Sequence, residues 1–279
     1  RAVLDEHQFD VIHLHEPMTP AICAAALALA QCPIVATHHA HGDLGWMRHG
    51  LHFWGFLMDR IDARIAVSPM AAESAARWIK DDYRVIPNGV LTPDEADPAD
   101  RDHAVVFIGR HDPRKGLPTL LRAWPAIHAA TGARLRLIGT DPLQYRLLHA
   151  RLRFDEAGID VLGIVTNEVR THELLRAKAS ITPALGGESF GLVLAEAFAC
   201  ATPAVASDIP GYAAVATPEA ALLVPPSDPG ALSAAVIDLL SDEARRVEMG
   251  RAARAHALAN YGWEDIARRL EEVYVEVAA

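Results

Sequence analysis

Short apolar runs alternate with helix-period segments along the whole chain, and this alternation constrains the fold more than any other feature. Many of the runs are continuous stretches of Val, Ile, Ala and Leu, which is typical of strands buried on both faces of a parallel sheet. The candidate strands are Phe9–His15, Ile34–His39, Ala63–Ser68, Arg84–Pro87, Ala104–Gly109, Leu135–Gly139, Val161–Val165, Ala179–Pro183, Ala204–Ser207 and Ala221–Val224. The segments between them are long enough for crossover helices. The sequence therefore predicts an α/β protein with doubly wound parallel sheets.

One segment interrupts the alternation. Residues 91–103 read LTPDEADPADRDH, a proline-containing and acidic stretch without apolar periodicity, which is typical of a linker. A chain of 279 residues is long enough for two domains. We expect domains over residues 1–92 and 103–260, followed by a helix over 261–279 that packs back toward the first domain. The first domain has few strands for a doubly wound unit, so we expect it to be incomplete.

Charge and cysteine content exclude several classes of protein. A formal net charge of −10 argues against an extended nucleic-acid surface. Cys23, Cys32 and Cys200 are few and unpatterned, which indicates thiols in a reducing compartment and a cytoplasmic protein. The longest run of small apolar residues, 21–30, is too short to span a bilayer.

The most informative motif is the stretch GGESFGLVLAE over residues 186–196. It places Glu188 in a loop before a predicted helix and Glu196 about two turns inside that helix. Free N–H groups at a helix start attract a diphosphate, and the carboxylates can accept hydrogen bonds from sugar and ribose hydroxyls. This geometry suits a nucleotide sugar. The alternative is an acidic first turn that only complements the helix dipole.

A basic loop follows the strand that ends at Gly109. It reads RHDPRKG and carries Arg110 and Lys115. Ligands of parallel sheets gather beyond the carboxyl ends of the strands, so we expect both cations beside Glu188. Two fixed cations can neutralise a diphosphate leaving group as its charge develops. The alternative is a solvated basic turn.

Histidines end two strands of the first domain. The stretch VATHHAH (35–41) closes one of them, and a histidine there could donate a hydrogen bond to a bound sugar or phosphate. His13 and His15 lie two residues apart on one face of a strand, as in metal-dependent hydrolases, although further ligands cannot be placed at matching strand ends. We expect His13, His38 and His41 to hydrogen-bond to nearby backbone instead.

Residues 43–61 are rich in aromatic and aliphatic side chains. One face of this segment could dock on a membrane surface or an acyl chain. The alternative is packing within the core or against the other domain.

Taken together, these motifs resemble a known enzyme family. The blocks that carry the likeness are HLHEP (13–17), VATHH (35–39), RIAVS (64–68), IPNGV (86–90), FIGRHDPRKG (107–116), LGGESFGLVLAE (185–196) and PAVASD (203–208). They resemble the retaining GT-B glycosyltransferases of family four, and within that family the phosphatidylinositol alpha-mannosyltransferases of actinobacteria. The likeness covers nearly the whole chain in order.

The resemblance implies two Rossmann-like domains facing a cleft and transfer of a hexose with retention of configuration. It implies mannose from GDP-mannose as the donor, a lipid or glycan hydroxyl as the acceptor, and no obligatory metal or other cofactor. It further implies peripheral contact with the inner face of the plasma membrane through residues 43–61.

The resemblance also implies roles for individual residues. The residues implied to be catalytic are His39, Arg110, Lys115 and Glu188. The residues implied to bind the donor are Gly109, Ile164, Val165, Ser189, Phe190, Gly191 and Glu196, with Glu196 on the ribose hydroxyls and Ile164 and Val165 along the base.

Three departures from the family pattern leave alternatives open. The glycine-rich loop with which the family opens has no match here, so a nucleotide-sugar-binding fragment without turnover is an alternative to an active transferase. The basic loop is one residue shorter, so Arg114 and Lys115 could exchange roles. His38 stands where the family has an aromatic residue.

Overall fold

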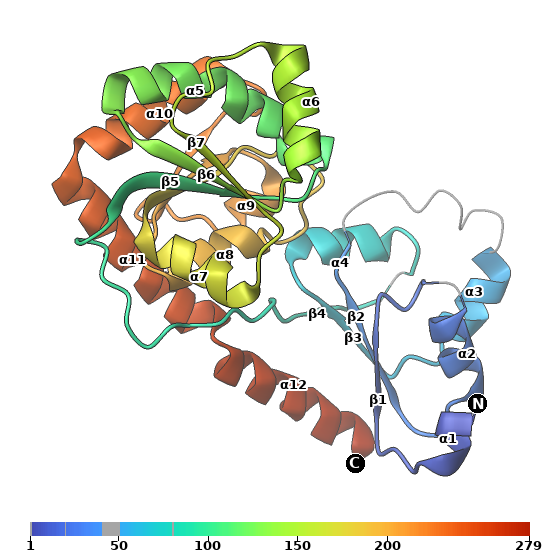
Figure 1. Ribbon diagram of the computed structural model, residues 1–279. Helices are drawn as coiled ribbons and strands as arrows, with labels where there is room; N and C mark the ends of the chain where they lie inside the picture. The colour runs from blue at the N-terminus through green and yellow to red at the C-terminus, as the bar shows by residue number, and fades with distance from the viewer. Residues whose placement is uncertain (1, 20, 41–50, 80) are drawn as a thin grey trace. The chain divides into compact units, whose positions relative to one another are not determined.

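The computed structural model describes all residues except 1, 20, 41–50 and 80, together with the side chains of all described residues except 5 and 51–54. The chain divides into two compact units, one formed by residues 1–89 with 263–279 and the other by residues 90–262. Each unit contains a parallel β-sheet with helices packed on it (Figure 1). The prediction of an α/β fold with parallel sheets is confirmed.

Every predicted strand is present in the structure. The strands are β1 (Ile12–His15), β2 (Ile34–His38), β3 (Ala63–Ala66), β4 (Arg84–Val85), β5 (Asp102–Ile108), β6 (Arg134–Ile138), β7 (Ile159–Gly163), β8 (Ala177–Thr182), β9 (Ala204–Ser207) and β10 (Ala221–Val224).

Helices lie between most successive strands, before the first strand and after the last one. Those before β5 are α1 (Ala2–Glu6), α2 (Ile22–Leu29), α3 (Leu51–Met58) and α4 (Pro69–Ala76). Those after it are α5 (Leu117–Thr131), α6 (Pro142–Leu152), α7 (Asn167–Arg176), α8 (Leu192–Ala199), α9 (Pro210–Ala213), α10 (Pro229–Ser241), α11 (Glu243–Tyr261) and α12 (Trp263–Ala278). A short 3₁₀ turn, Pro113–Lys115, precedes α5.

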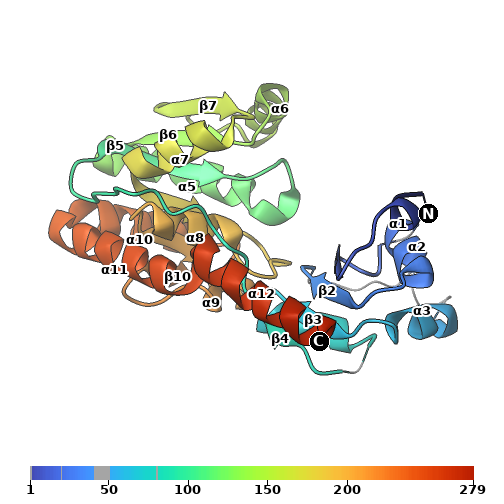
Figure 2. The ribbon, with the colours of Figure 1, turned by 90° about the horizontal axis from the view of Figure 1, so that it is seen from below.

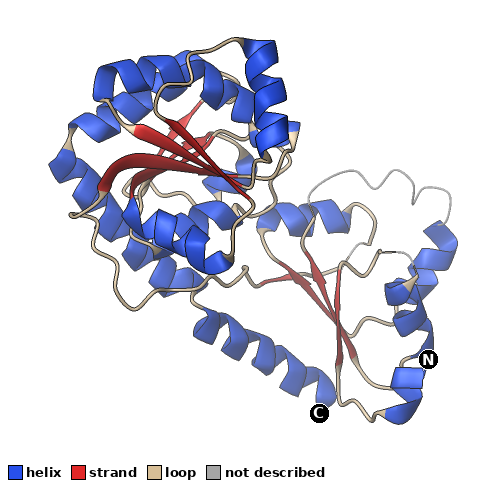
Figure 3. Cartoon of the chain, in the orientation of Figure 1, coloured by secondary structure: helices blue, strands red, loops and turns tan. Residues whose placement is uncertain are grey.

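The larger unit has a sheet in the order β10-β9-β8-β5-β6-β7, covered on both faces (Figure 3). Side chains of β5 alternate between the two faces: Val105 and Phe107 pack with α5 and α10, whereas Val106 and Ile108 pack with α7 and α8. The fully buried Trp124 of α5 lies in the first of these cores. Burial on both faces explains why these strands read as continuous apolar runs.

The smaller unit has a sheet in the order β1-β2-β3-β4. Ile34 and Ala36 of β2 pack with α2 and α3 on one face. Val35 packs on the other face with Ile266 and Val273 of α12, so the C-terminal helix covers the sheet formed by the first part of the chain (Figures 1 and 2).

The acidic segment 91–101 belongs to the larger unit and packs on it. Arg254 donates to the carbonyl oxygen of Pro93 at 2.6 Å, and Arg246 donates to that of Pro98 at 2.8 Å. Arg101 is buried and donates to carbonyl oxygens at the ends of α7 and α8. Buried guanidinium groups that satisfy backbone acceptors fix this segment against the sheet's helices.

Candidate functional site

The loops that follow β5 and β8 lie side by side because these two strands are neighbours in the sheet. The N–H of Leu185 donates to the carbonyl oxygen of Arg114 at 2.7 Å. Gly116 has a φ of 70°, and a Cβ at this position would lie 1.7 Å from the carbonyl oxygen of Pro183. Only glycine permits so close an approach. The two predicted motifs therefore form one surface at the carboxyl end of the sheet.

Lys115 and Glu188 form an ion pair across these loops. Lys115 Nζ lies 2.7 Å from Glu188 Oε1, and the side chains are only 23% and 15% exposed. The backbone of Glu188 packs closely against Gly211: a Cβ at position 211 would lie 2.1 Å from the carbonyl oxygen of Glu188. The structure thus brings the predicted cation and carboxylate into contact.

The two arginines of the basic loop differ in their partners. Arg114 donates through Nη2 to Asp112 Oδ2 at 2.7 Å and through Nε to the same oxygen at 3.1 Å. These hydrogen bonds lower the pKa of Asp112. Arg110 is exposed, and its guanidinium forms no hydrogen bond or ion pair with any residue in the described part of the chain. Its guanidinium is therefore available to an anion.

Helix α8 begins at this surface without a side-chain cap. Its N-cap residue, Gly191, has a φ of 86°, and a Cβ there would lie 2.9 Å from the ring of Tyr212. Phe190 is buried with its ring edge-on to Tyr261 at 5.4 Å between centroids, and Ser189 precedes it in the loop. Because Gly191 has no side chain, the N-cap residue itself offers no side-chain oxygen to the first N–H groups of the helix. Such a helix start is suited to bind a phosphate.

Glu196 lies inside α8, and one of its two carboxylate oxygens accepts a hydrogen bond. Arg170 of α7 donates to Glu196 Oε1 at 2.7 Å, whereas Oε2 is buried without a hydrogen-bond partner among the described residues. Burial raises the pKa of Glu196, and Arg170 opposes this shift. A buried acceptor without a donor is costly. Oε2 is therefore a position where a ligand hydroxyl would be stabilising.

The remaining residues that the sequence predicts to bind the donor lie at the same edge of the sheet. Gly109 follows β5, and Ile164 and Val165 follow β7. Val165 packs into the apolar core under the sheet, whereas Ile164 is 87% exposed. Ile164 thus offers an apolar side chain to solvent at the edge where the base is expected.

His39 lies in the smaller unit directly after β2. The backbone N–H groups of His39 and Ala40 donate to Glu16 Oε1. The Nε2 atom of His39 lies 2.8 Å from Nδ1 of His15. Burial lowers the pKa of His39, and the neighbouring His15 lowers it further. Burial thus favours the neutral form of the His39 ring.

His13 is not placed to bind a metal. Its Nδ1 lies 2.6 Å from the hydroxyl of Tyr274, and its Nε2 lies 2.7 Å from that of Thr37. Within the described ranges no group of three or more His, Cys, Asp and Glu side chains could hold a metal ion. The expectation that His13 and His38 bond to nearby backbone is wrong: His13 bonds to side chains, and both ring nitrogens of His38 lack a partner in the part of the chain described here. His41, for which the same was expected, lies outside the described residues.

The aromatic segment 43–61 lies partly outside the described residues. In its described part, Leu57 and Met58 pack in the core of the smaller unit and Phe56 is 71% exposed. None of the helices that the structure describes is both long and apolar enough to cross a bilayer.

The sequence analysis missed three residues that hydrogen-bond to candidate site residues or their loops, namely Glu16, Asp112 and Arg170. Glu16 and Asp112 lie inside motifs that were recognised, so proximity in sequence is the signal that could have found them. Arg170 comes from α7, twenty-six positions before Glu196, and nothing in the local pattern marks it.

Two family models match the chain. The model described as glycosyl transferases group 1 matches residues 102–242, and the model described as glycosyltransferase family 4 matches residues 1–94.

Individual proteins agree with the family models. The phosphatidyl-myo-inositol mannosyltransferase of Mycobacterium leprae is 35% identical, over 100% of this chain and 76% of that protein. The GDP-mannose-dependent monoacylated alpha-(1-6)-phosphatidylinositol monomannoside mannosyltransferase of Corynebacterium glutamicum is 29% identical, over 86% of this chain and 69% of that protein.

The solved structure of sucrose-phosphate synthase from Thermosynechococcus elongatus superposes with a TM-score of 0.81 at 24% identity, covering 99% of this chain and 75% of that one. This likeness identifies the fold as GT-B. With the family models and the relatives, it leads to one conclusion: the chain belongs to the group 1 glycosyl transferases, in the family that includes the phosphatidyl-myo-inositol mannosyltransferases, and it is a glycosyltransferase.

Proposed function

We propose that this glycosyltransferase moves mannose from GDP-mannose to a hydroxyl of a phosphatidylinositol lipid, with retention of the anomeric configuration. The observation that carries the proposal is the Lys115–Glu188 pair at the uncapped start of α8. The names of the two mannosyltransferase relatives support the choice of donor and acceptor.

The diphosphate of the donor binds beside this pair. Arg110 and Lys115 supply positive charge, and the first N–H groups of α8 donate hydrogen bonds to phosphate oxygens. Lys115 must then exchange part of its contact with Glu188 for a phosphate oxygen. The Glu188 carboxylate released in this way accepts hydrogen bonds from hydroxyls of the hexose.

Transfer follows a front-face substitution. The bond between the sugar C1 and the phosphate oxygen breaks, and its electron pair leaves with the nucleoside diphosphate. The acceptor oxygen bonds to C1 on the same face, and its proton passes to the departing phosphate oxygen. Arg110 and Lys115 stabilise the charge that develops on this leaving group. No protein nucleophile takes part.

The nucleoside lies along the carboxyl edge of the larger unit's sheet. Glu196 Oε2, buried and without a donor among the described residues, accepts a hydrogen bond from a ribose hydroxyl. The exposed Ile164 packs against the base. His39, whose burial lowers the pKa of its ring, donates a hydrogen bond to the sugar–phosphate region.

A divalent metal is not required because side-chain cations of the chain carry the charge compensation. Removal of divalent ions with a chelator is therefore expected to leave turnover unchanged. Loss of turnover on chelation, restored by added magnesium or manganese, would contradict this part of the proposal.

The acceptor lipid brings the protein to the inner face of the plasma membrane. The exposed Phe56 and the aromatic composition of residues 43–61 favour peripheral contact through this segment. Co-flotation with vesicles of phosphatidylinositol and phosphatidylcholine tests this contact. Phe56→Ser should reduce the bound fraction, and binding unchanged by this substitution would argue against the segment.

The experiment that tests the whole proposal is incubation with GDP-mannose and phosphatidylinositol vesicles, followed by mass spectrometry of the lipid. A lipid heavier by one hexose, with the α configuration by NMR, is expected. Binding of GDP-mannose without any lipid or hydrolysis product would instead indicate a nucleotide-sugar-binding protein without turnover.

A further inference from the structure

Helix α6 of the larger unit is apolar on two opposite sides. On its inner side, Tyr145 and Leu148 are buried in the core beneath α5. On its outer side, Leu143 and Leu147 are 65% and 63% exposed. Successive residues of a helix turn by about 100°, so these two leucines lie within about 40° of one another. Core packing explains the inner side of α6 but not the outer one.

Arginines flank the outer leucines on both sides. By the same helical rotation, Arg146 lies on one side of the strip formed by Leu143, Leu147 and Ala150, and Arg151 lies on the other. Both arginines are exposed, and their guanidinium groups form no hydrogen bond or ion pair with the residues that the structure describes. The outer face of α6 is therefore an apolar strip between two positive charges.

The acidic side chains around α6 are already engaged. The helix itself carries no acidic residue. Asp141 precedes it and accepts from its first N–H groups. Past its end, Asp155 and Glu156 accept hydrogen bonds within the unit, and Asp160 pairs with Arg134. In a chain with a net charge of −10, the outer face of α6 is thus locally positive.

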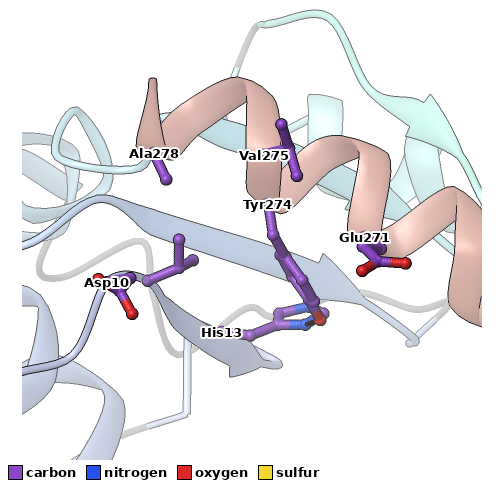
Figure 4. A pocket seen from close by; sticks show the side chains of 7 residues that line it. Asp10, His13, Glu271, Tyr274, Val275 and Ala278 are labelled. Carbon is purple, nitrogen blue, oxygen red and sulfur yellow. Dashed lines mark hydrogen bonds between the residues drawn. The ribbon is translucent and has the colours of Figure 1, made fainter.

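An exposed apolar residue of the smaller unit has the opposite surroundings. Val275 of α12 is 66% exposed and borders a hollow of about 500 Å³ between α12 and the start of β1 (Figure 4). Asp10 and Glu271 line the same hollow. An anionic surface repels these carboxylates, so Val275 matches the α6 leucines in exposure but not in charge.

We propose that the outer face of α6 docks on an anionic lipid surface. Leu143 and Leu147 enter the boundary between headgroups and acyl chains, while the longer side chains of Arg146 and Arg151 reach the lipid phosphates on either side. The contact belongs to the larger unit and is separate from the one proposed for residues 43–61. It does not depend on glycosyl transfer, because lipid binding is measured without a donor.

The apolar part of the proposal is tested with vesicles of phosphatidylglycerol and phosphatidylcholine. The double variant Leu143→Ser/Leu147→Ser should lower the partition coefficient of the protein about tenfold. Val275→Ser, the control for loss of an equally exposed apolar side chain, should leave the partition coefficient unchanged. A wild type that does not bind these vesicles, or equal binding by the wild type and the double variant, would overturn the proposal.

The charged part is tested on the same vesicles. Arg146→Gln/Arg151→Gln should lower the partition coefficient about twentyfold, because each cation near an anionic surface contributes about fivefold. Arg146→Lys/Arg151→Lys keeps both charges and should keep most of the binding. Equal binding by the glutamine variant and the wild type would contradict a role for these arginines.

A polarity-sensitive fluorophore locates the contact. It is attached to Leu147→Cys in a Cys32→Ser background, since Cys23 and Cys200 are buried. On vesicles its emission should shift to the blue and be quenched by spin-labelled acyl chains. The same label at Ala244→Cys, an exposed position of α11, should show neither change. Bound protein whose label at position 147 stays unquenched would show that another segment makes the contact.

Association between copies of the chain is the competing use of an exposed apolar face. Sedimentation equilibrium without lipid should give the same mass for the wild type and for Leu143→Ser/Leu147→Ser. A wild-type dimer that the double variant dissociates would replace the lipid surface by a second copy as the occupant. Both leucines are exposed, so the double variant should unfold at the temperature of the wild type, and its binding loss then reports the surface rather than the fold.

Discussion

Lys115 Nζ lies 2.7 Å from Glu188 Oε1, although 73 positions separate the two residues in the sequence. The contact exists because β5 and β8 are adjacent in the sheet and their carboxyl ends release the two loops at the same edge. In the proposed donor complex a phosphate oxygen takes over part of the contact between Lys115 and Glu188. Under this proposal, substitution of either residue should lower catalysis more than any other change in these loops.

Lys115→Ala should lower kcat by about a hundredfold, because a fixed cation that stabilises a developing phosphate charge contributes on the order of 3 kcal/mol. Steady-state kinetics with GDP-mannose measures the effect. Lys178→Ala, in β8 and outside the site, is the control for loss of a lysine. If the kcat of Lys115→Ala is close to that of the control variant, Lys115 does not stabilise the leaving group.

Glu196→Ala should weaken the binding of GDP much more than the binding of a 2′,3′-dideoxy analogue. Only GDP has the ribose hydroxyls that can donate a hydrogen bond to Glu196 Oε2. The loss for GDP is about 1.5 to 3 kcal/mol, the range for a hydrogen bond to a charged partner. Isothermal titration of both nucleotides against both proteins gives the difference. Equal losses for the two nucleotides would show that Glu196 acts elsewhere than at the ribose.

Gly116→Ala should destabilise the fold by about 3 kcal/mol, because the new methyl group would overlap the carbonyl oxygen of Pro183 and the backbone is left-handed. Gly132 has a similar φ of 68° but nothing within 4 Å of a Cβ, so Gly132→Ala should cost only about 1 kcal/mol. Urea unfolding of both variants measures the two free energies. A smaller loss in Gly116→Ala than in Gly132→Ala would contradict the close approach of the two loops.

The free energy of unfolding should fall as the pH drops from about 6.5 toward 4, partly because of His38. This ring is 1% exposed, and burial lowers its pKa to about 4. In this pH range His38 therefore binds a proton in the unfolded chain but not in the folded chain. This difference lowers the free energy of unfolding by about 1.4 kcal/mol per pH unit. His38→Phe keeps an aromatic ring against Tyr83 and should reduce the slope by one proton. Urea unfolding across this range measures the slope, and an identical slope in both proteins would contradict a neutral His38.

The strands could be predicted because both faces of each sheet are covered, which leaves a continuous apolar run in the sequence. The residues at which the strands begin and end could not be predicted in this way. The run beginning at Phe9 suggested a strand from that residue, but β1 starts at Ile12, opposite Ile34. Pro33 has no N–H to extend the ladder, and strand ends depend on such partners rather than on the strand's own residues.

The part of the candidate site that lies within sequence motifs could be predicted. The pattern placed Lys115 and Glu188 at strand ends, and parallel strands bring their carboxyl ends together. The partners across the fold could not be found in this way. Arg170 reaches Glu196 from another helix, and Tyr274 reaches His13 from 261 positions away. Such contacts depend on tertiary packing, which leaves no local signal in the sequence.

The most direct test of the account is a crystal structure of the protein with GDP bound. The account predicts phosphate oxygens within hydrogen-bond distance of Lys115 Nζ and the Arg110 guanidinium, at the N-terminus of α8, with a ribose hydroxyl on Glu196 Oε2. A nucleotide bound elsewhere, with Lys115 still held by Glu188 and no phosphate at α8, would contradict it.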